Sequence, residues 1–104
     1  TGMLSVIAEI EIIAGKRDKF LDEFRKVVPL VLAEDGCVEY GPTLDAMTDI
    51  AAQISRRDNI VTIVEKWESV DALKAHLVAP HMTEYRVRVK EFVVGSVLRI
   101  LDAV

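Results

Sequence analysis

The sequence predicts an α+β domain of the ferredoxin-like type, with the element order βαββαβ and a four-stranded antiparallel sheet covered by helices on one side. Three observations lead to this fold. The chain has 104 residues, 51% of them hydrophobic, which suits one folded domain and excludes disorder. Strand-like segments, in which apolar residues alternate, are followed along the chain by segments with helical periodicity. Right-handed crossovers arrange elements in this order into such a sheet.

The first strand is predicted over residues 4–13, where every even position is apolar. Gly15 ends it, and apolar residues then recur at intervals of three and four, which predicts a helix over residues 16–34. Because a proline removes a backbone donor and crowds the preceding turn, Pro29 predicts a kink or break near residues 26–29. The main apolar positions of this helix are Phe20, Phe24, Val27 and Val31.

The second strand begins at Cys37 and is interrupted after Tyr40 by Gly41-Pro42. Proline cannot donate to a central ladder, so this strand belongs at a sheet edge or carries a bulge. Residues 45–58 lack a sustained period and predict a long connection, with room for one helical turn around residues 50–54.

The clearest strand covers residues 60–68 and is rich in branched side chains. Its alternation places Val61, Ile63, Glu65 and Trp67 on one face. Ser69 is a favourable N-cap for a short helix that ends before Pro80. A further helix is predicted to about residue 91, where strand-like alternation competes with it; Gly95 ends it, and a last strand follows over residues 96–101. The expected strand order, 4-1-3-2, puts the second strand at an edge.

The predicted strands carry large aliphatic side chains on both faces, although helices cover only one. In the first strand, for example, Ile7 and Ile13 lie opposite Val6 and Ile12. The second face needs a cover, and the economical one is a second copy of the chain. We therefore expect a symmetric homodimer packed sheet to sheet.

Charge and cysteine content exclude several classes of partner. Thirteen Lys and Arg against seventeen Asp and Glu give a net charge of -4, so neither nucleic acid nor an anionic membrane is expected as a partner. No apolar run reaches the roughly 18 residues of a membrane span. The single Cys37 cannot form an internal disulfide, which favours the cytoplasm. Thr1-Gly2 before Met3 suggests a cloning remnant, so one domain is expected over residues 3–104.

A segment starting at Glu65 carries Glu-x-Trp, then Ala-Leu-x-Ala-His, and then Pro-His ending at His81. In order and spacing it resembles the signature of the antibiotic biosynthesis monooxygenase family. The run Glu-Asp-Gly-Cys-Val-Glu-Tyr from Glu34 is similar to the family's Glu-Pro-Gly-Cys-x-x-Tyr turn, with Asp35 in place of Pro. The likeness covers nearly the whole chain, and its main departure is the connection over residues 45–58, which is longer than the family's usual hairpin.

The resemblance implies a dimeric α/β barrel built from ferredoxin-like domains. Relatives include cofactor-free oxygenases acting on aromatic polyketides and quinols, haem-degrading enzymes and an isomerase. The haem-degrading branch uses an Asn on the first strand that is missing here, so no cofactor is expected. The leading expectation is oxidation of a small aromatic quinol or phenol with dioxygen. An isomerase or tautomerase on the same fold and a non-catalytic small-ligand-binding protein are the alternatives.

An oxygenase without a cofactor must turn its substrate into an electron-rich anion, because triplet dioxygen reacts slowly with closed-shell molecules. It therefore needs a base and a dry pocket. His76 and His81 are the two histidines of the chain, and their near-neutral pKa makes either a candidate base, with His76 first. Alternatively, His81 caps a helix after Pro80 or faces solvent. Their spacing across a proline does not suit a metal pair, so no metal site is expected.

Trp67 and Glu65 are the other catalytic candidates. Trp67 belongs to the core or forms a flat wall for an aromatic ring, with its indole N–H donating to a substrate oxygen; the family motif favours the wall. Glu65 lies in an apolar strand, where burial would raise its pKa and make it an acid or base. Pairing with an arginine such as Arg99 is the alternative.

The predicted pocket lies between sheet and helices and is lined by Trp67, His76 and Tyr40. Tyr40 and Tyr85 are expected to donate hydrogen bonds to bound substrate, and Arg86 to stabilise its anion. His81 completes the expected substrate-binding set.

Overall fold

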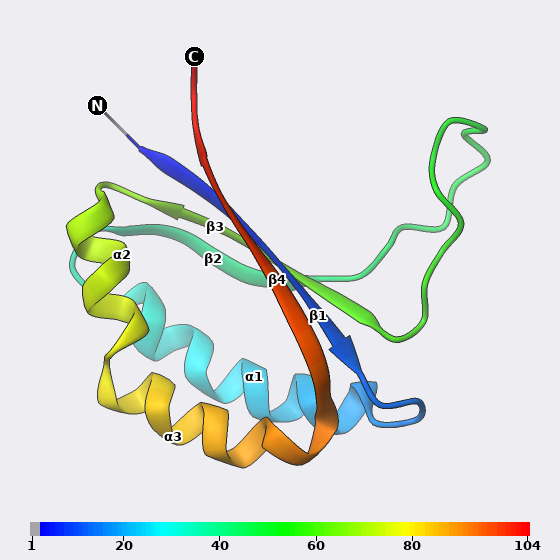
Figure 1. Cartoon of the computed structure of the whole chain (residues 1–104), viewed down its shortest axis with the longest axis horizontal. Coiled ribbons are helices and arrows are strands. Elements are labelled where there is room, and N and C mark those ends of the chain that lie inside the picture. Colours follow the sequence, from blue (N-terminus) through cyan, green and yellow to red (C-terminus); the bar gives the residue numbers. More distant parts are fainter. Residues whose placement is uncertain (1–2) are drawn as a thin grey trace.

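Figure 1 shows the chain as a computed structural model, which describes residues 3–104. The possible cloning remnant, Thr1-Gly2, lies outside the described residues. The elements are β1 (Leu4–Ile12), α1 (Arg17–Leu32), β2 (Cys37–Thr43), β3 (Ile60–Trp67), α2 (Val70–Leu77), α3 (Pro80–Val89), the 3-10 helix η1 (Lys90–Phe92) and β4 (Val93–Asp102). The sheet has the antiparallel order β2-β3-β1-β4, so the ferredoxin-like fold and its strand order are confirmed.

The helices all lie on one side of the sheet (Figure 1). Alternation in the two central strands sends the even residues of β1 and the odd residues of β3 toward them. The α1 stripe packs against these side chains and forms the core. We call the other side, without helices, the open face. The fully buried large side chains are Trp67, Phe20, Phe24, Ile12, Ile63, Val6, Val27, Val31 and Val61.

The proline-based prediction for β2 is confirmed in both of its forms. β2 is an edge strand, and its register against β3 shifts between Cys37 and Glu39, as it does at a bulge. β2 nevertheless continues through Gly41-Pro42 to Thr43, and Pro42 pairs with Ile63. The missing N–H is tolerated because one edge of β2 has no neighbouring strand.

Three local predictions were wrong. α1 is not broken near Pro29, because the proline lies in an exposed position near the end of the helix and the helix continues to Leu32. The helical stretch continues from α3 through η1 to Phe92, close to the predicted end at about residue 91, but β4 begins at Val93 rather than at residue 96. Gly95 therefore lies inside β4, opposite Glu11, where pairing with β1 overrides its low strand propensity. Residues 50–54 form a turn rather than a helix.

The turn between α1 and β2 requires glycine for two reasons. Gly36 has a φ of +82°, and a Cβ built on it would lie 2.6 Å from the Cβ of Ala72 in α2. Its carbonyl also accepts a 2.8 Å hydrogen bond from the Glu68 N–H. The turn is therefore held against the junction between β3 and α2, with no room for a side chain.

We expect Gly36→Ala to lower the free energy of unfolding by about 2 kcal/mol, from the left-handed φ together with the clash. Gly15→Ala is the matched control, because Gly15 has the same φ of +82° but open space around it, and it should cost about 1 kcal/mol. Urea unfolding of both variants measures the difference. Equal losses would show that the close approach to Ala72 has no energetic effect.

β4 differs from the other strands in being exposed along almost its whole length. The exposed large apolar side chains of β4 lie on both sides of the sheet, and further exposed apolar side chains lie near it. They are Ile13, Val64, Val94, Val97, Leu98, Ile100 and Leu101. Within the described part of the chain, no helix is long and apolar enough to cross a membrane.

Candidate functional site

Glu65 and Trp67 point from β3 toward the helices, as the alternation predicts. Trp67 is fully buried, Glu65 is 6% exposed, and the indole N–H donates a 2.9 Å hydrogen bond to Oε1 of Glu65. The alternative partner, Arg99, is wrong: it pairs with Ile7, whose side chain lies on the open face. The buried carboxyl group thus has an indole as its partner rather than a cation.

Glu34 joins the two histidines. It follows α1, and its Oε2 lies 2.9 Å from Nδ1 of His76 at the end of α2 and 2.7 Å from Nε2 of His81 in the first turn of α3. An ionised carboxylate can only accept, so these two nitrogens carry the protons when both imidazoles are neutral. His76 then has an unprotonated Nε2, the nitrogen that can act as a base.

Burial and neighbouring charges set the protonation states of this cluster. Burial lowers the pKa of His76, and the hydrogen bond to Glu34 opposes the shift in part. Burial raises the pKa of Glu65 to about 7, the hydrogen bond from Trp67 lowers it, and the charge of Glu34 adds to the rise. Near neutral pH the site therefore holds a neutral imidazole beside a carboxyl group that is close to half protonated.

Tyr40 lies beside His76, with ring centroids 5.3 Å apart, and the Trp67 ring lies 4.6 Å from the same imidazole. Burial raises the pKa of the Tyr40 phenol well above its usual range. Of the sequence-predicted residues, Glu65, Trp67, His76, His81 and Tyr40 therefore gather at one end of the layer between sheet and helices. Glu34 completes this group, which we call the histidine cluster.

Tyr85 and Arg86 lie elsewhere, at a cavity of about 580 Å³ between α3 and the helix side of β1 and β4. Burial raises the pKa of Tyr85, while Arg86 lowers it in part. The cavity is lined by Ile10, Thr83, Tyr85, Arg86, Val87, Val89, Lys90, Val93 and Ser96. We call it the α3 cavity.

The α3 cavity is not the predicted pocket, because Trp67, His76 and Tyr40 do not line it. Aromatic rings fill the space between. The Tyr85 ring is 5.6 Å from that of Phe24, which stacks on Tyr40 at 5.5 Å. Tyr85 is therefore the residue that belongs both to the α3 cavity and to the aromatic layer leading to His76.

Glu34 is the residue that the sequence analysis missed. It is the first residue of the Glu-Asp-Gly-Cys-x-x-Tyr turn, which was the available signal, but it lies 42 and 47 positions before its partners. Among residues 3–104 no group of three or more His, Cys, Asp or Glu side chains is arranged to hold a metal ion. Glu34 and the two histidines instead form hydrogen bonds with one another.

Cys37 lies near this site but takes no part in the cluster. Burial and the charges of Glu34 and Glu65 raise the pKa of its thiol to about 11. The thiol is therefore protonated and poorly nucleophilic at neutral pH. Cys37 is partly buried and packs against the core.

Comparisons with known proteins support the sequence resemblance. Residues 3–88 match the family described as antibiotic biosynthesis monooxygenase. The probable quinol monooxygenase YgiN of Escherichia coli K12 is 45% identical over 102 residues, which cover 96% of this chain and 97% of YgiN.

Solved structures share the fold. PA3566 from Pseudomonas aeruginosa superimposes with a TM-score of 0.83 at 20% identity, covering 100% of this chain and 96% of that one. Rv0793 from Mycobacterium tuberculosis gives a TM-score of 0.79 at 22% identity, covering 98% and 95%. At this level of identity the likeness concerns the fold alone.

Proposed function

The chain belongs to the antibiotic biosynthesis monooxygenase family, and we propose that it oxidises a small aromatic quinol or phenol with dioxygen and without a bound cofactor. One observation carries this proposal: His76 is kept neutral by its burial and oriented by its hydrogen bond to Glu34, with Trp67 and Tyr40 against its ring. The name of the relative YgiN, a probable quinol monooxygenase, supports the class of substrate.

The proposed reaction begins with proton transfer from a phenolic hydroxyl to Nε2 of His76. Glu34 stabilises the imidazolium that forms, because its carboxylate accepts the hydrogen bond from Nδ1–H. The resulting anion donates one electron to dioxygen, which removes the spin barrier, and the two radicals combine. For hydroquinone, one oxygen atom enters the ring and the other leaves as water, so hydroquinone and O₂ give hydroxybenzoquinone and H₂O.

The other residues bind the substrate in this proposal. The α3 cavity is the entrance, where Arg86 attracts the developing anion, and the Tyr85 ring turns aside to join the cavity to His76. Tyr40 donates a hydrogen bond to the substrate oxygen, and Trp67 supports the ring. Glu65 accepts the indole N–H and holds the Trp67 ring in its orientation. His81 connects Glu34 to the partly exposed surface, where the proton reaches solvent.

The test is oxidation of hydroquinone under ¹⁸O₂, with protein previously dialysed against a chelator. We expect protein-dependent oxygen uptake, with one labelled atom in the quinone and one in water. Product without oxygen would instead indicate the isomerase or tautomerase, and a ligand-induced rise in Tm without product would indicate a binding protein. Unlabelled quinone would exclude monooxygenation.

A homodimer packed through the open face is part of the proposal. Its support is the set of apolar residues exposed there, including Val64, Val97 and Leu101. Sedimentation equilibrium at micromolar concentration should give a mass of about 23 kDa, twice the 11.6 kDa of the chain. A single species of 11.6 kDa would contradict it. We also propose a cytoplasmic location, for which the single free thiol of Cys37 is the support.

A further inference from the structure

Residues 44–59 connect β2 to β3 and extend beyond the sheet, away from the helices (Figure 1). We call this segment the arm. We propose that the arm of one protomer docks on the beginning of β4 in a second copy of the chain. The inference depends on the homodimer of the proposed function and adds the surface by which each copy holds the other.

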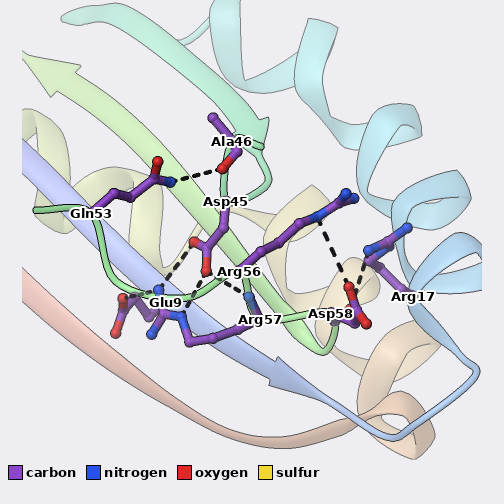
Figure 2. Close-up of polar contacts among 8 residues, drawn as sticks. All are labelled: Glu9, Arg17, Asp45, Ala46, Gln53, Arg56, Arg57 and Asp58. Atoms are coloured by element: carbon purple, nitrogen blue, oxygen red, sulfur yellow. Dashed lines mark hydrogen bonds and ion pairs between the residues drawn. The ribbon is translucent and has the colours of Figure 1, made fainter. Parts of the chain in front are cut away.

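The base of the arm is fixed by Arg57 (Figure 2). Its guanidinium binds Asp45 through Nε at 2.8 Å and through Nη2 at 3.2 Å, and Nη2 also lies 3.0 Å from Oε1 of Glu9 in β1. The Arg57 N–H donates to the same Asp45 carboxylate at 3.0 Å. Such a two-pronged contact fixes both ends of the arm to each other and to the sheet.

The tip of the arm is closed on itself. The Gln53 side chain donates to the carbonyl of Ala46 at 2.8 Å, and the Gln53 N–H donates to the carbonyl of Ile50 at 3.1 Å. Outside these bonds the tip presents apolar side chains to solvent: Met47 is 80% exposed, Ile50 63% and Ile54 62%. A loop that is already ordered loses little conformational entropy on docking, so an apolar, preorganised tip is suited to bind a surface.

The contact between Arg57 and Glu9 shows on which face of the sheet the arm is held. Glu9 has the odd parity of β1, so its side chain lies on the open face, whereas the α3 cavity opens on the helix side at Ile10. The arm is therefore held on the face that lacks a cover in the protomer. A second copy of the chain is the occupant that this face requires.

Sheet topology indicates which part of the second copy the arm meets. β2 and β4 are opposite edges of the sheet. The proposal includes a two-fold axis parallel to the strands, which places the β2 edge of one copy over the β4 edge of the other. Thr43 at the end of β2 and Gly95 near the start of β4 lie at the same end of the sheet, opposite Thr62 and Glu11. The arm thus reaches the beginning of β4 in the second copy.

The receiving surface has matching chemistry. Val97, near the beginning of β4, lies opposite Glu9 on the open face and is 60% exposed. Arg99, which lies on the open face opposite Ile7, is exposed, and Asp49 is exposed at the tip of the arm, so the charges are complementary.

The test uses the full chain with the photo-cross-linker p-benzoylphenylalanine in place of Ile50. In an equimolar mixture of ¹⁴N and ¹⁵N protein, we expect cross-linked dimers with mixed labels whose joined peptide contains residues 93–97. The same cross-linker at Val78, which is 77% exposed at the end of α2, is the matched control and should give no dimer. Cross-links within one chain, or to other elements of the second copy, would overturn the proposal.

A second measurement separates the arm from the dimer as such. Replacing Met47, Ile50 and Ile54 together by Ser should raise the dimer dissociation constant at least tenfold, while Val78→Ser leaves it unchanged. If the wild-type chain is dimeric and the triple variant dimerises equally well, arm docking is wrong although the open-face dimer stands. If the wild-type chain is monomeric, both are wrong.

Discussion

Replacing His76 by Ala is expected to lower the turnover of hydroquinone oxidation by about 100-fold or more, the usual contribution of a general base. The variant removes the only imidazole that Trp67 and Tyr40 flank. Oxygen uptake, corrected for autoxidation of hydroquinone, measures the loss, and far-UV circular dichroism checks the fold. His81→Ala is the matched control, because it removes the other partner of Glu34 and should reduce turnover much less. Equal rates for wild type and His76→Ala would exclude this base.

The pH profile gives a sharper version of this test. Only neutral His76 accepts a proton, so kcat rises with pH as His76 loses its proton. Because burial lowers the pKa of His76 below the ordinary 6.5, we expect the midpoint of this increase in kcat to lie below pH 6.5. Glu34 acts in the opposite direction and raises the pKa of His76, so Glu34→Gln should move the rise to still lower pH. A variant that only lowered the stability of the fold would leave the midpoint of the pH dependence of kcat unchanged.

Replacing Glu65 by Gln is expected to stabilise the protein by about 3 kcal/mol at pH 8 and to change little at pH 4, at about 1.4 kcal/mol per pKa unit. Burial raises the pKa of Glu65 from 4.5 to about 7, so the folded state binds the proton more tightly than the unfolded chain. The free energy of unfolding therefore falls as pH rises between these values. The amide of Gln does not titrate and still accepts the indole N–H of Trp67.

Urea unfolding of wild type and Glu65→Gln at pH 4 and pH 8 measures this effect. Glu68→Gln is the control for net charge alone, since Glu68 is exposed next to the same strand. If the free energy of unfolding changes equally between pH 4 and pH 8 in the Glu65→Gln variant and in wild type, Glu65 does not titrate between these pH values. In that case the structural argument for its protonated state fails.

Patterns that depend on near neighbours could be predicted from the sequence. The alternation of β3 placed Glu65 and Trp67 together on the inner face, and Pro42 placed β2 at an edge. Local signals failed where tertiary context decides. Gly95 continues a strand because β1 pairs with it, and Pro29 is tolerated because it lies near an exposed helix end.

The site was harder to predict than the fold, because its defining contacts join distant parts of the chain. The turn motif draws attention to Glu34, but it does not show that the carboxylate binds histidines from two later helices. The position of the α3 cavity depends in the same way on how Phe24, Tyr40 and Tyr85 fill the interior. Periodicity assigns a side chain to a face, but it does not say which aromatic ring occupies which space on that face.

The tight turn at Gly36 has a consequence for mutational surveys. Glu34 lies two residues before it, so we expect a side chain at position 36 that pushes the turn away from Ala72 to move the Glu34 carboxylate away from both imidazoles. A mutational screen that measures only quinone formation would group Gly36 with the catalytic residues, although glycine contributes no functional group to the reaction. Scoring each hit by melting temperature as well would separate the two classes.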